Sequence, residues 1–136
     1  HLSRLMAAGD AVILARSEDV VGDFQTSLLA FGKNLLKDNP DLGVRFMAAY
    51  LKGVEQYNEG KTERNLQVLA EATGESIEVL QSSCWIPINN DGSIDFSAVD
   101  RYQQWAYQYG QLDAVLTEEQ FWDPGFLTKA KNLLKP

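Results

Sequence analysis

NPDLGVRFMAAYLKGVEQYNEG, residues 39–60, carries the clearest helical pattern in the chain. Asn39 is a good N-cap, and proline is favoured at the first position of a helix. The large apolar residues recur at the spacing of one helical face, which predicts a core-facing stripe. Gly60 is a typical stop signal. The predicted stripe comprises Phe46, Met47, Tyr50, Leu51, Val54 and Tyr57.

Further helices are predicted on the C-terminal side of this stretch, each from its own start signal. Thr62 and Ser76 are predicted caps, and Gly74 ends the helix between them. Asp95 or Ser97 begins another helix, and Thr117 opens a capping box. Asp123-Pro124 repeats the pattern of a cap followed by proline. About five or six helices are therefore expected.

The first 35 residues show a different pattern. Residues 2–8 look like the tail of a helix that ends at Gly9. Ala11–Ala15 is a short apolar run with a β-branched pair, and the run from Phe24 to Phe31 is aromatic and apolar with Thr and Ser. Both runs favour short strands, although a helical turn at 11–15 stays open. The predicted fold class is α/β, mostly helical, with two short strands.

Composition and charge exclude several classes of protein. The chain has 136 residues, of which 45% are hydrophobic, so it fits one folded domain. Its net charge of −7 and the lack of a basic cluster argue against nucleic acid as a partner. Cys84 is the only cysteine and His1 the only histidine. These residues supply no nucleophilic triad and no cysteine-histidine metal site, so we predict no enzyme, no metal and no cofactor.

Other features have ordinary structural interpretations. Asp91-Gly92 resembles the middle of a calcium loop, but the positions that need carboxylates hold Pro87 and Ala98. Tyr102, Trp105 and Tyr109 lie at helical spacing, which favours internal packing over a ligand platform. Cys84 is expected to be a buried, inert thiol.

An ordered set of stretches resembles the C-terminal portion of the periplasmic solute-binding proteins of ABC importers, of the nitrate/sulfonate/taurine and thiamine-pyrimidine type. The similarity extends over almost the whole chain. The stretches that carry it are Ala11-Val12 through Asp23–Ser27, Phe31–Lys33 through Asn39–Gly53, Tyr57–Thr62, Cys84–Ile88 with Asp91, Gly92 and Asp95, and Phe121–Leu127.

The resemblance implies a two-lobed type II binding-protein fold with ligand between the lobes. Residues 1–24 would form the end of the second lobe and the crossover, and residues 25–136 the helix-rich C-terminal part of the first lobe. Phe24, Gln25 and Thr26 would then contact the ligand, a small organic anion or heterocycle. Gly22 departs from the family pattern, which has proline there.

The same resemblance implies a periplasmic or extracytoplasmic protein, secreted or lipid-anchored, that delivers its ligand to an ABC permease of the inner membrane. The chain begins with His1 and carries no signal peptide, so we expect it to be a piece of a longer or processed protein. The synthase branch of the family uses a cysteine-rich motif and a histidine, which this chain does not supply.

Two further hypotheses follow from the same residues. The chain could be a free-standing helical interaction module, derived from this family but without ligand binding. Unpaired edges of the two predicted strands would also allow a homodimer.

Overall fold

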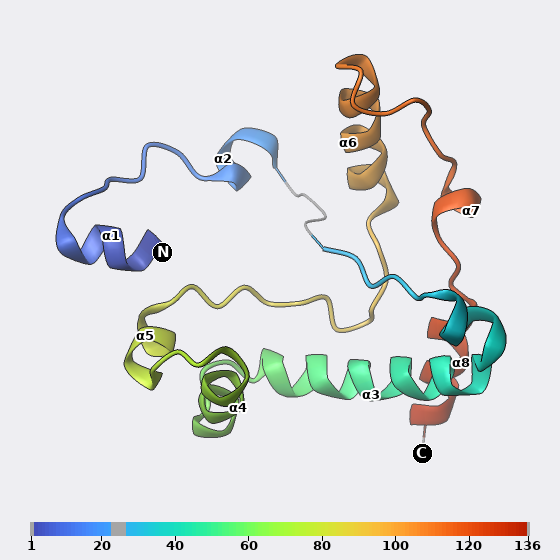
Figure 1. The fold of residues 1–136 in the computed structure, drawn as a ribbon, viewed down its shortest axis with the longest axis horizontal. Helices are drawn as coiled ribbons and strands as arrows, with labels where there is room; N and C mark the ends of the chain where they lie inside the picture. The colour runs from blue at the N-terminus through green and yellow to red at the C-terminus, as the bar shows by residue number, and fades with distance from the viewer. Residues whose placement is uncertain (1, 23–26, 136) are drawn as a thin grey trace. The chain divides into compact units, whose positions relative to one another are not determined.

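The computed structural model describes residues 2–22 and 27–135 of the chain (Figure 1). These residues form eight α-helices and one short π-helical turn, η1. The helices are α1 (Leu2–Ala8), α2 (Ser17–Val21), α3 (Pro40–Asn58), α4 (Glu63–Thr73), α5 (Ile77–Ser82), α6 (Phe96–Gln108), α7 (Glu118–Phe121) and α8 (Gly125–Leu134), with η1 (Asn34–Asp38) directly before α3.

The predicted α/β fold class is wrong for this chain, because the described residues contain helices and no strand. Residues 11–16 and 27–32 have irregular backbone, and residues 24–26 of the second predicted strand lie outside the described part. A strand is stable only when a neighbouring strand satisfies its backbone hydrogen bonds. Apolar composition without such a neighbour does not make a strand, and Val12 and Leu14 stay 78% and 94% exposed.

Three of the helix starts predicted after residue 39 are confirmed by side-chain caps, at Thr62, Ser76 and Asp95. The Thr62 hydroxyl accepts a hydrogen bond from the Asn65 N–H at 3.2 Å, and the Ser76 hydroxyl accepts one from Val79. Asp95, and not Ser97, is the cap of α6. Gly74 ends α4 with a φ of 71°, a left-handed conformation that favours glycine.

The chain divides into two compact units. The first is formed from His1–Arg16 and Leu51–Asn90, and the second from Ser17–Tyr50 and Asp91–Pro136. In the first unit α4 and α5 pack together, and Leu51, Val54 and Leu66 are buried. The core of each unit is therefore small and is built from a few helical turns.

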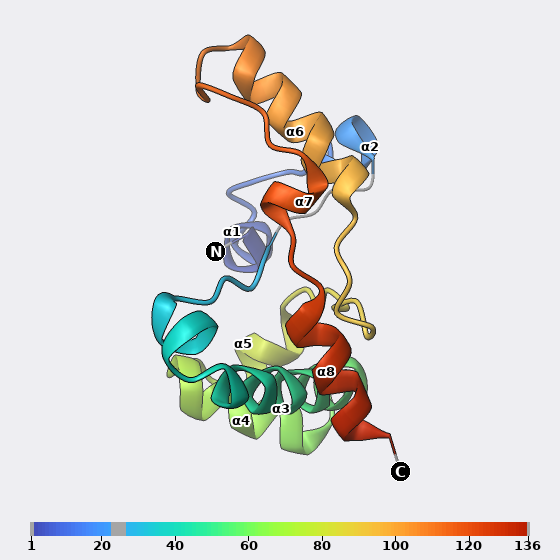
Figure 2. The same cartoon turned by 90° about the vertical axis from the view of Figure 1, so that its right-hand side faces the viewer.

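The second unit is organised around the first half of α3. The ring of Phe31 meets Phe46 and Phe126 edge-on, at centroid distances of 5.7 and 5.3 Å. Figure 2 shows α8 beside this half of α3, and it shows the chain after α6 running back along that helix toward α7. The buried residues of this unit are Gly43, Val44, Met47, Ala48, Ala98, Val99, Gln103, Ala106, Leu127 and Ala130.

Candidate functional site

The three residues predicted to contact ligand, Phe24, Gln25 and Thr26, lie outside the described residues, so this assignment stays a prediction. The preceding Gly22 has a φ of 69°. Proline is restricted to a φ near −65°, so it could not adopt this backbone. Gly22 thus adopts a left-handed backbone conformation, which favours glycine.

The densest group of directed contacts lies at the C-terminal end of α3, in the first unit. The indole of Trp85 stacks on the ring of Tyr57, with centroids 4.6 Å apart and planes 15° from parallel. The Trp85 Nε1–H also donates to the Tyr57 carbonyl at 3.1 Å. Trp85 therefore holds the irregular segment that follows α5 against the end of α3.

Asn58 holds the same segment three to five residues after Trp85, at Ile88 and Asn90. Its Oδ1 accepts from the Ile88 N–H at 3.0 Å, and its Nδ2 donates to the Ile88 carbonyl at 2.6 Å and to the side chain of Asn90. One amide side chain thus satisfies both backbone groups of Ile88, as a neighbouring strand would do. We call residues 84–90, held in this way, the strap.

Lys61 and Asn65 complete the group. The Lys61 ammonium donates to the carbonyls of Gln81 and Ser83, at the C-terminal end of α5, where a cation is favoured by the helix dipole. Asn65 is only 4% exposed, and its Nδ2 donates to the carbonyls of Gln56 and Gly60. Apart from the bond from Asn58 to the Asn90 side chain, each bond that the side chains of this group donate goes to a backbone carbonyl of the chain itself. The group therefore positions the strap.

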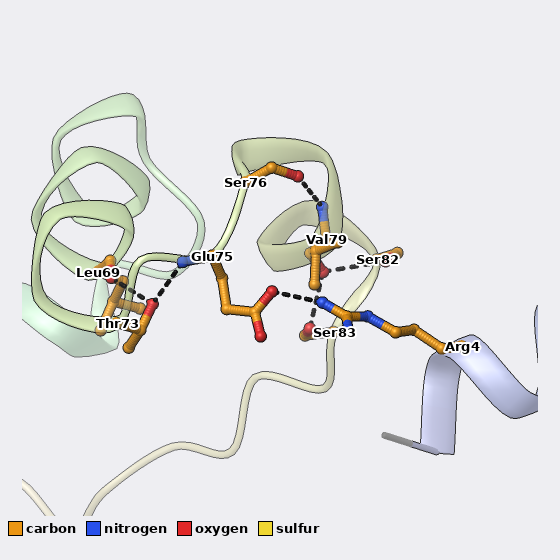
Figure 3. Close-up of polar contacts among 8 residues, drawn as sticks. All are labelled: Arg4, Leu69, Thr73, Glu75, Ser76, Val79, Ser82 and Ser83. Carbon is orange, nitrogen blue, oxygen red and sulfur yellow. Dashed lines mark hydrogen bonds and ion pairs between the residues drawn. The ribbon is translucent and has the colours of Figure 1, made fainter.

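Figure 3 shows a further link within the first unit. The guanidinium of Arg4 on α1 lies 2.5 Å from the Glu75 carboxylate, in the turn between α4 and α5. The two side chains are 58% and 44% exposed. An exposed pair of this kind contributes about 1 kcal/mol at most, because solvent and salt screen it. It joins α1 to the unit without creating a buried charge.

In the second unit, Gln103 is the buried polar residue of α6, with 6% exposure. Its Oε1 accepts from the Leu116 N–H at 3.0 Å, and its Nε2 donates to the Leu116 carbonyl at 3.3 Å. This pairing fastens the returning segment to α6. Throughout the described residues, every buried side-chain nitrogen and oxygen has a hydrogen-bond partner.

Another side of α6 carries a row of aromatic rings. Trp105 lies between Tyr102 and Tyr109, at centroid distances of 5.8 and 5.3 Å. All three side chains are about half exposed or more within the structure. Cys84 is also exposed, so the prediction of a buried thiol is wrong. The reason is that α5 ends at Ser82, before its apolar face could include residue 84.

Among the residues that the structure describes, three carboxylates have a lowered pKa, and all three belong to helix starts. The backbone N–H of Glu78 and the Ser76 hydroxyl lower the pKa of that carboxyl, and Glu119 has a lowered pKa through its own N–H and Thr117. The Ser97 hydroxyl, followed by the Ala98 N–H, lowers the pKa of Asp95. Lowered values keep these groups ionised, which suits capping and does not suit a general acid.

The described residues bring together no group of three or more His, Cys, Asp or Glu side chains that could hold a metal ion. Within residues 2–22 and 27–135, no helix has both the length and the apolar character needed to cross a bilayer. Neither a family model, nor a curated protein, nor a solved structure matches the chain.

Proposed function

We propose that this chain is part of an extracytoplasmic solute-binding protein that captures a small organic anion or heterocycle and delivers it to an ABC permease. The ordered resemblance over residues 11–127 suggests this role. The proposal keeps Phe24, Gln25 and Thr26 as ligand contacts. An amide that both donates and accepts, beside an aromatic wall, suits a flat polar ligand.

The observation that carries the proposal is the imbalance between buried and exposed apolar side chains. In the described residues, 11 hydrophobic residues are buried, and four of these are alanines, whereas 22 large hydrophobic residues are exposed. In the second unit Phe46, Trp105 and Leu133 are each about half exposed or more. Helices that present this much apolar surface are typical of an outer layer that packs on further protein.

The free-standing interaction module remains the second candidate, and the aromatic row on α6 favours it. Exposed aromatic side chains are enriched where proteins bind one another. The two candidates differ in one respect that can be measured. A solute-binding protein gains stability from its small ligand, whereas an interaction module does not.

The test uses the product of the complete gene that contains this chain. Its melting temperature is measured with nitrate, taurine, other sulfonates and pyrimidines. A ligand present at 100 times its Kd stabilises the folded state by about 2.7 kcal/mol, which gives a clear upward shift. Gln25→Ala should reduce that shift, and Gln104→Ala, an exposed glutamine of α6, should leave it unchanged.

The outcomes separate the two candidates. A shift that depends on Gln25, with matching heat in calorimetry, supports the binding protein. If no ligand of these classes moves the melting temperature and calorimetry gives no heat, the binding role is overturned. If a ligand binds equally to both variants, the binding role stands and the assignment of Gln25 is wrong.

A further inference from the structure

The segment DAVILAR, residues 10–16, lies between α1 and α2 with irregular backbone. It contains neither proline nor glycine, and the large side chains at its centre are Val12, Ile13 and Leu14. Their exposed fractions are 78%, 42% and 94%. This alternation is the period of two that an extended chain shows when one of its faces is turned to solvent. The face of Val12 and Leu14 is the more exposed one.

The sequence of this segment is complementary to that of a second copy that runs in the opposite direction. When two copies lie antiparallel about Ile13, Ala11 lies opposite Ala15 and Val12 lies opposite Leu14. At the two ends, Asp10 of each copy lies opposite Arg16 of the other. Directly opposed residues share one face of an antiparallel pair, and opposed charges of unlike sign stabilise it. Small residues therefore meet small ones, large residues meet large ones, and each acid meets a base.

We propose that residues 10–16 are a self-association segment, and that its occupant is the same segment of a second copy of this chain. The two segments pair about a two-fold axis through Ile13, and the backbone of each then hydrogen-bonds to the backbone of the other. A two-fold contact uses the same patch on both copies, which the reversed order of residues satisfies. The inference concerns this chain alone and does not rest on the proposed function.

The pairing should be weak, because an isolated pair of short strands is only marginally stable in water. Val12 and Leu14 supply the apolar contact, and the two Asp10–Arg16 pairs set the register. A shift by one residue would oppose Asp10 to Ala15 and remove the charge pairing. The end charges are therefore the part of the segment that distinguishes this pairing from general hydrophobic association.

Charge exchange tests the proposal on the full 136-residue chain. Sedimentation equilibrium gives the dimerisation constant of the wild type, D10R, R16D and the double variant D10R/R16D, up to about 0.5 mM chain in order to detect weak association. Each single reversal places like charges opposite each other at both ends, and should weaken dimerisation at least about fivefold. The double variant restores the unlike pairs and should return to the wild-type constant.

Circular dichroism of each variant verifies that the helix content is unchanged. The proposal is overturned if the wild type stays monomeric over the whole range, or if the single reversals leave dimerisation unaltered. It is equally overturned if both single reversals weaken the dimer and the double variant fails to restore it, because the charges would then act elsewhere.

Discussion

Alanine at Gly43 should destabilise the protein, although the substitution favours helix formation by itself. Gly43 lies in the first turns of α3, where a Cβ atom would come within 2.7 Å of the Phe126 ring and 2.8 Å of the Leu35 carbonyl oxygen. The ring belongs to α8, and the carbonyl belongs to η1 directly before α3. The glycine is therefore the point where three elements of the second unit meet most closely.

The magnitude follows from two opposing contributions. Replacing glycine with alanine in a helix interior gains about 1 kcal/mol of helix propensity. Against this, an ordinary carbon–oxygen contact is about 3.4 Å. The added Cβ atom and the Leu35 carbonyl oxygen must therefore move apart by roughly 0.6 Å. Overpacking of this kind costs about 1–3 kcal/mol. We expect Gly43→Ala to lower the free energy of unfolding by about 1 kcal/mol.

Gly53 in the same helix is the matched control, since a Cβ atom there would have no neighbour within 4 Å. Gly53→Ala should raise the free energy of unfolding by about 0.5–1 kcal/mol. Urea unfolding followed by circular dichroism at 222 nm measures both variants. The reasoning is refuted if Gly43→Ala is as stable as Gly53→Ala, because the close approach would then carry no cost.

Three further predictions concern two polar side chains that hold neighbouring segments, Asn58 and Gln103, and the helix cap Asp95. Asn58→Ala removes both bonds to the strap backbone and should lower the free energy of unfolding by about 1–2 kcal/mol. In a chain whose other tryptophans are replaced by phenylalanine, the same substitution should shift the fluorescence emission of Trp85 to the red. Unchanged emission would contradict the role of Asn58 in holding the strap. Gln103→Ala should lower the free energy of unfolding in urea by about 1–3 kcal/mol. Gln104→Ala, at an exposed position, should change it by no more than about 0.5 kcal/mol. Equal effects would show that the bonds of Gln103 to Leu116 do not stabilise the fold. The fold lowers the pKa of Asp95, so the ionised carboxylate stabilises the folded protein at pH values above the pKa of the unfolded chain. This stabilisation is lost as the pH falls below about 4 and through the pKa of the folded state. Asp95→Asn should therefore show a shallower loss of helix on acidification by circular dichroism, and a curve identical to the wild type would contradict this.

Local signals allowed the helix starts to be predicted from sequence. A cap such as Thr62 satisfies N–H groups within its own turn, so its effect is contained in a few neighbouring residues. The core stripe of α3 was predicted less well. Met47, Leu51 and Val54 are buried as expected, but Phe46 is 46% exposed and Val44 and Ala48 are buried instead. Periodicity defines a face of a helix, whereas the neighbouring elements determine which edge of that face is covered.

The bonds by which Asn58 and Gln103 hold distant segments could not be predicted, because each depends on a partner far away in the sequence. Asn58 reaches Ile88 across 30 residues, and Gln103 reaches Leu116 across 13. Nothing in the residue type distinguishes Gln103, which is buried, from its exposed neighbour Gln104. One signal was available for Gln103: it lies between Val99 and Ala106 at helical spacing, so a polar residue occupied a predicted apolar face.

The failed strand prediction at residues 11–15 shows what such a pattern means. Val, Ile and Leu in succession favour an extended chain with a neighbour on at least one side, but they do not supply that neighbour. In the described residues the segment has the exposure alternation of a strand without the ladder. The sequence pattern therefore indicates a tendency to pair with a neighbouring strand. The charge exchange at Asp10 and Arg16 tests whether a second copy of the chain can supply that strand. If it is, strand formation in this chain is a property of its association and not of its fold.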